Sequence, residues 1–175
     1  MQFVALLRGI NVSGQRKMPM AQLRALLERN GHAPVSTYIA SGNVVLEAGE
    51  LDEDTLRERL EDLIEAEFGF STDVVIRTPA EWRAVIVSNP FPGREEHLHV
   101  SFLSAPPPET ATRVLDAVTR PPEEWRVVGR DLYLVLASGF AESKLAPVIS
   151  PQKLKVSATT RNWRTVLAIA KLLRD

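Results

Sequence analysis

The sequence contains no cysteine, so disulfide bonds, thiol nucleophiles and thiolate metal sites are all excluded. It also lacks a charge imbalance, because 21 Lys and Arg residues stand against 22 Asp and Glu residues. A duplex-binding domain normally carries a basic excess. Sheets that bind single strands need exposed aromatic residues, and aromatics make up only 6% of this chain. A nucleic-acid partner is therefore not favoured.

Long hydrophobic runs are absent as well. The N-terminal segment is apolar only from Phe3 to Leu7 before it meets Arg8, which is too short for a signal peptide or a membrane span. We therefore expect a cytoplasmic protein without a membrane partner. The content of 45% hydrophobic and 25% charged residues is ordinary for a folded protein and excludes wholesale disorder.

The first half of the sequence predicts strands and helices in the order βαββαβ, which is that of a ferredoxin-like unit. Asp52 is the predicted N-cap of its second helix, and Gly69 is the predicted end of that helix. The expected elements are a strand at 2–7, a helix at 19–30, strands at 35–40 and 43–47, a helix at 52–68 and a strand at 73–77.

The second half follows a capping box at Thr78 and Glu81 and a turn-rich break at 89–93. Its order, roughly β-α-β-β-α, is an imperfect echo of the first half. The expected elements are a strand at 97–104, a helix after 106–108, a hairpin of 125–128 and 132–136, helical pieces in 142–154 and a last helix opening at 159–164.

We therefore predict an α+β fold of two ferredoxin-like (βαββαβ-type) halves with antiparallel sheets covered by helices. The halves are expected at 1–78 and 79–175, packed together as one compact unit.

The first candidate site is the loop from Arg8 to Lys17, which has three cations and two glycines. Gly9 and Gly14 have the spacing of a Walker A loop, but Gln15 follows Gly14 where that loop needs lysine. A nucleotide triphosphatase is therefore not expected. The loop is interpreted either as an amide-rich anion site or as a solvated connection.

Two further polar segments are candidate binding groups. Ser41 and Asn43 stand on either side of a glycine between two strands, where they form a turn or present hydrogen-bonding groups beside the first loop. Thr160, Arg161 and Asn162 are predicted to open the last helix, whose first amides attract anions. A harmless exposed arginine is the alternative for this segment.

Histidine spacing is the only hint of a metal site. His97 and His99 alternate with Ser101 on a predicted strand, but the one other histidine is His32 and no acidic cluster accompanies them. The first half also lacks the second His-x-Ser/Thr motif of a two-histidine phosphoesterase. We predict neither a metal nor a cofactor.

Five blocks of the sequence are distinctive when taken together, namely Ala5–Val12, Tyr38–Val45, Asn89–Phe91, Ser143–Leu145 and Ala158–Trp163. In this order they resemble an uncharacterised bacterial family, domain of unknown function 1697. This family usually has glycine where the chain has Ser13, and often glutamine where it has Ala40. The resemblance covers essentially the whole chain and implies two ferredoxin-like halves, but no reaction, cofactor or catalytic residue.

The functional prediction is a protein that binds a small molecule or anion at a cationic polar site between the halves, with catalysis left open. In this hypothesis the first loop and the start of the last helix share one ligand. The alternatives are a single-stranded nucleic-acid module and a protein-interaction module. The predicted ligand-binding residues are Arg8, Gly9, Asn11, Gly14, Lys17, Ser41, Asn43, Thr160, Arg161 and Asn162.

Overall fold

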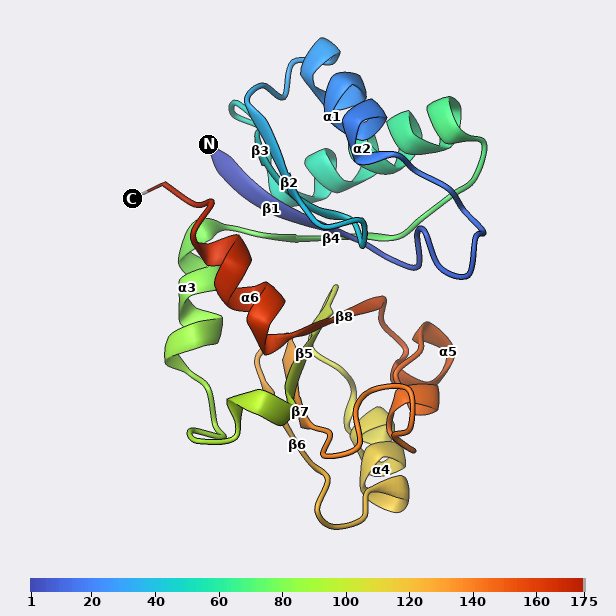
Figure 1. The fold of residues 1–175 in the computed structure, drawn as a ribbon, viewed down its shortest axis with the longest axis vertical. Coiled ribbons are helices and arrows are strands. Elements are labelled where there is room, and N and C mark those ends of the chain that lie inside the picture. Colours follow the sequence, from blue (N-terminus) through green and yellow to red (C-terminus); the bar gives the residue numbers. More distant parts are fainter. Residues whose placement is uncertain (175) are drawn as a thin grey trace. The chain divides into compact units, whose positions relative to one another are not determined.

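The computed structural model describes residues 1–174 and divides the chain into two compact units (Figure 1). The first unit is Met1–Ala84 with Ala168–Asp175, and the second is Val85–Leu167. The boundaries fall inside the helices α3 (Pro79–Val87) and α6 (Trp163–Ala170). No helix among the described residues is long and apolar enough to cross a membrane.

The first unit holds a four-stranded antiparallel sheet in the order β2-β3-β1-β4, with α1 and α2 on one face (Figure 1). This strand order, together with the order of elements along the chain, is the ferredoxin-like arrangement. The elements are β1 (Gln2–Leu7), α1 (Met20–Arg29), β2 (Val35–Tyr38), β3 (Asn43–Glu47), α2 (Glu53–Phe68) and β4 (Val74–Arg77).

Alternation along β1 explains why the helices cover this face. Phe3, Ala5 and Leu7 point to the same side of the sheet and join one buried cluster with Leu23 of α1 and Leu60 of α2. Each fully buried Leu or Phe side chain contributes about 1.5–3 kcal/mol to folding. The hydrophobic pattern therefore fixes the register of β1 against both helices.

The predicted ends of α2 are confirmed. The side chain of Asp52 accepts a hydrogen bond from the Thr55 amide at 2.8 Å, and Gly69 ends the helix with φ of +75°. The first helix begins at Met20, one residue later than predicted, because Pro19 has an extended ψ of 128°. The carbonyl of Pro19 still accepts the amide of Leu23 at 3.1 Å.

The second unit repeats this arrangement with a sheet in the order β6-β7-β5-β8, again antiparallel. The predicted fold of two ferredoxin-like halves with antiparallel sheets covered by helices is therefore confirmed. The elements are β5 (Leu98–Leu103), α4 (Glu109–Val118), β6 (Glu124–Val128), β7 (Asp131–Val135), α5 (Pro151–Leu154) and β8 (Ala158–Asn162).

The prediction that Thr160, Arg161 and Asn162 open the last helix is wrong, because these residues belong to β8. Their backbone pairs with β5, and Thr160 lies opposite Ser101. Threonine is β-branched and therefore favours a strand. The pairing itself could not be predicted locally, because the partner strand β5 is distant in the sequence. Asn162 then ends β8 and caps α6, since its Oδ1 accepts the amide of Thr165 at 2.9 Å.

The echo between the halves extends to the junction after the fourth strand. Arg77 in β4 and Arg161 in β8 are both buried, with 0% and 8% of their surface exposed. Thr78 follows Arg77 and caps α3 by accepting the Glu81 amide at 3.2 Å, as Asn162 caps α6. The predicted capping box is also complete, because the Thr78 amide donates to the Glu81 carboxylate at 2.8 Å.

His32 lies buried between α1 and β2, with 2% of its surface exposed. Its Nδ1 is 3.1 Å from the carbonyl oxygen of Glu47, whereas its Nε2 has no hydrogen-bond partner among the described residues. Burial lowers the pKa of His32, and the charge of Arg59 lowers it further, against the opposing effect of the Glu47 carbonyl.

We expect the free energy of unfolding to fall as the pH drops below about 6.5, the ordinary histidine pKa. Below this pH the unfolded chain binds a proton that the folded chain binds less readily. His99, whose pKa is also lowered by burial, acts in the same direction. Urea midpoints measured from about pH 8 to pH 5 should change less in His32→Gln than in the wild-type protein. Identical pH profiles would contradict this expectation.

Candidate functional site

The first loop forms a small hairpin, here called the finger (residues 11–16). The amide of Asn11 donates to the carbonyl of Arg16 at 3.1 Å, and that of Gln15 donates to Val12 at 3.0 Å. Ser13 and Gly14 occupy the tip with φ of +50° and +73°, as the central residues of a type I′ turn do. The loop is thus internally hydrogen-bonded, and two of its amides are already used.

The side chain of Asn11 holds the finger in place. Its Nδ2 donates to the carbonyls of Met18 at 2.9 Å and Ala40 at 2.8 Å, and its Oδ1 accepts the amide of Met18 at 2.7 Å. These bonds join the two ends of the first loop to each other and to the turn between β2 and β3. Asn11 therefore has a structural role that the sequence did not indicate.

The cations of the loop differ in their partners. Arg8 lies 3.7 Å from the Asp73 carboxylate. Arg16 stacks over the ring of Phe70, with its guanidinium carbon 5.2 Å from the ring centre, and donates to the carbonyl of Ser71. It also packs beside Gly9, where a Cβ would lie 3.5 Å from Nη1 of Arg16.

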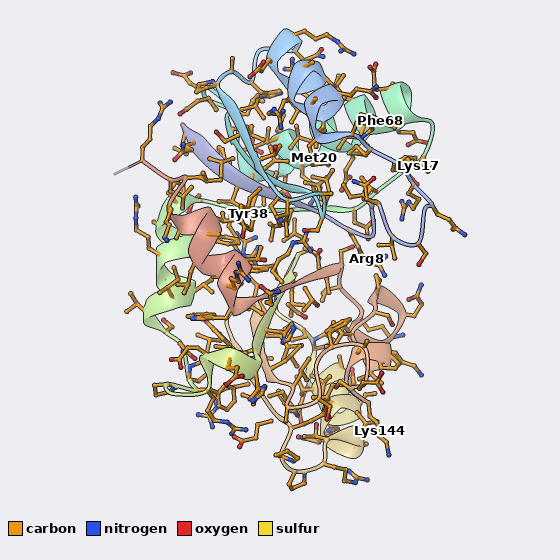
Figure 2. All side chains as sticks on the ribbon, in the orientation of Figure 1. Arg8, Lys17, Met20, Tyr38, Phe68 and Lys144 are labelled. Atoms are coloured by element: carbon orange, nitrogen blue, oxygen red, sulfur yellow. The ribbon has the colours of Figure 1, made fainter. Side chains whose placement is uncertain are left out.

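Lys17 is exposed, and no other described residue bonds to its ammonium. It lies with Arg8 on the first loop, and Figure 2 labels both. Lys17 is therefore the cation of this loop that is most available to a ligand.

Ser41 and Asn43 close the turn beside the finger. Asn43 is fully buried, and its Nδ2 donates to the carbonyl of Tyr38 and to Oγ of Ser41, both at 2.9 Å. Gly42 between them packs against the first loop, since a Cβ there would lie 2.9 Å from Cδ1 of Ile10. The structure thus brings the first two predicted segments together within the first unit.

The third predicted segment lies in the second unit. Thr160 shares a 2.5 Å hydrogen bond with Ser101. Arg161 donates to Oγ1 of Thr159 at 2.7 Å and to the carbonyl of Thr160 at 2.9 Å, and burial lowers its pKa to about 10. The ligand shared between this segment and the first loop stays a prediction.

The two histidines of the fourth candidate do not share one strand. His97 belongs to a short 3₁₀ turn, Glu95–His97, because its amide bonds back to the carbonyl of Arg94 at 3.1 Å. His99 lies in β5, with its ring 6.1 Å from that of Phe140. Among the described residues no three His, Asp or Glu side chains are grouped as metal ligands.

A groove that sequence reasoning missed lies in the first unit, with a volume of about 600 Å³. Its walls come from four segments that are far apart in the sequence, so no local motif could have indicated it. The lining residues are Met1, Gln2, Glu47, Thr78, Pro79, Ala80, Arg83 and Arg174.

Comparison with known proteins gives a family and a fold. The family described as "Protein of unknown function (DUF1697)" matches residues 1–133. The solved structure of the conserved bacterial protein SP0830 from Streptococcus pneumoniae is 20% identical, with a TM-score of 0.77 over 99% of this chain and 98% of that chain. Among curated proteins, none matches. The match over residues 1–133 shows that the chain belongs to the DUF1697 family.

Proposed function

We propose that this protein binds a small anionic molecule through its first loop, with Lys17 and Arg8 as the charged contacts. The segment from Arg8 to Lys17 carries three cations and no acidic residue. A phosphate or carboxylate would accept charge-assisted hydrogen bonds from such cations.

Backbone strain in the finger is the observation that carries this proposal. Asn11, Ser13 and Arg16 have φ of +54°, +50° and +49°, a conformation that residues other than glycine rarely adopt. Each such residue costs about 1–3 kcal/mol and persists only where surrounding contacts enforce it, which is typical of binding loops. Here the Asn11 hydrogen bonds and the stacking of Arg16 supply those contacts.

We expect Lys17→Ala and Arg8→Ala each to weaken phosphate binding about tenfold, because each removes one charge-assisted contact. The probe is inorganic phosphate, titrated while the amide signals of the finger are followed by NMR. Lys153→Ala, which removes an exposed lysine from α5 in the second unit, is the matched control. Wild-type affinity in both loop variants, or no phosphate binding at all, would refute the proposal.

A protein-interaction surface is the second candidate function, because two aliphatic side chains are exposed on the joined loops. Val12 is 59% exposed and Ile39 is 54% exposed, and Ile39 has φ of +49°, which is rare for a β-branched residue. A protein partner would bury both side chains, whereas a small anion need not. Sensitivity of binding to Val12→Ser would therefore distinguish the two functions.

A further inference from the structure

The groove of the first unit is held together by contacts between sequence-distant segments. The guanidinium of Arg83 on α3 donates to the carbonyl of Arg174 at 2.6 Å. The amide of Arg174 donates in turn to Oε1 of Gln2 at the start of β1, at 3.0 Å. These bonds place the C-terminal segment beside β1 and α3, so both arginines line the same groove.

The charges around the groove are mostly positive. Among the residues that the structure describes, the guanidiniums of Arg83 and Arg174 and the amine of Met1 line it together with the carboxylate of Glu47. The Glu47 carboxylate forms ion pairs with two of these cations, the Met1 amine at 3.4 Å and Nη1 of Arg174 at 3.5 Å. The groove therefore favours a negatively charged occupant.

The nearest acid on α3 does not reverse this balance. The carboxylate of Glu81 accepts hydrogen bonds from the amide and hydroxyl of Thr78, at 2.8 Å and 2.9 Å. It is held by the capping box at the start of the helix and is not among the residues that line the groove. Within residues 1–174, Glu47 is thus the acidic side chain that lines the groove.

Size and wall chemistry indicate what kind of anion fits. A volume of about 600 Å³ lies within the ordinary range of small-molecule sites. Besides the charges, the walls include the apolar side chains of Met1, Pro79 and Ala80, which suit an organic body better than a bare ion. The planar guanidinium of arginine matches the oxygen spacing of a phosphate group.

We propose that this groove binds an organic phosphate ester, with Arg83 and Arg174 as the phosphate ligands and Pro79 and Ala80 against the organic body. The site shares no residue with the first loop and does not depend on the function proposed for that loop. Changing Arg83 or Arg174 to glutamine therefore tests the groove while the first loop stays intact.

The test is a calorimetric titration with ribose 5-phosphate, ribose and inorganic phosphate. The ester should bind more tightly than ribose or phosphate, and Arg83→Gln and Arg174→Gln should each weaken it about tenfold. Arg113→Gln is the matched control, because Arg113 is 72% exposed against 67% for Arg174 and lies in the second unit. No binding at about 1 mM ester, or equal affinity in all three variants, would overturn the proposal.

A gain-of-affinity variant gives a readout that structural damage would not produce. Glu47→Gln removes the carboxylate that competes for Arg174 and repels the phosphate, so the ester should bind several-fold more tightly. Lys153→Ala, an exposed lysine of α5 in the second unit, should leave ester binding unchanged. Weaker or unaltered binding in Glu47→Gln would count against the phosphate contacts assigned to the arginines.

Discussion

Replacing Gly42 with alanine is expected to lower the free energy of unfolding by about 2–5 kcal/mol. A Cβ at this position would lie 2.7 Å from Cβ of Leu7 and 2.9 Å from Cδ1 of Ile10. Both neighbours are buried, with 1% and 3% of their surface exposed, and Cβ of Leu7 is fixed by the backbone of β1. The backbone would also be strained, since φ of Gly42 is +80°.

Gly49→Ala separates the two contributions. Gly49 has φ of +58°, but no atom lies within 4 Å of the position that a Cβ would occupy. Its replacement should therefore cost only the backbone term, about 1–2 kcal/mol. Urea unfolding of the two variants measures the difference, and equal losses would show that the close approach to Leu7 is relieved at no cost.

The predicted parts of the fold rest on local signals. Asp52, Gly69 and the Thr78–Glu81 capping box each act within four residues of their partners, so the sequence is sufficient to place them. Strand β8 was mistaken for a helix start because it is polar and leads directly into α6. Its strand character comes from pairing with β5, which lies some sixty residues earlier in the chain.

In the candidate site, too, local signals could be predicted from the sequence but contacts between distant segments could not. The sequence indicated Asn11 and Asn43 as polar groups of two glycine-containing segments, but only the structure shows which atoms their side chains bond. Asn11 bonds to Ala40, 29 residues away, and Asn43 to Tyr38 and Ser41 of its own turn. The groove is harder still to predict from the sequence, because Arg83 and Arg174 are 91 residues apart and lie in no shared motif.

Burial changes what is expected of Arg161. The sequence predicts Arg161 as a ligand-binding residue, and removal of such a residue would weaken binding more than it would lower stability. In the structure only 8% of Arg161 is exposed, and its guanidinium bonds to Thr159 and Thr160. Removing it leaves a cavity and takes one hydrogen-bond donor from Oγ1 of Thr159. The free energy of unfolding should therefore fall by about 2–4 kcal/mol.

Two further variants identify the cause of that loss. Arg161→Met fills much of the same volume without burying a charge, so it should lose less stability than Arg161→Ala. Arg164→Ala removes an exposed arginine of α6 and should change stability by no more than about 0.5 kcal/mol. Chemical denaturation of the three variants tests this order. If Arg161→Ala proved as stable as Arg164→Ala, the guanidinium would not be structural, and the ligand-binding part predicted for Arg161 would become the better explanation of its position.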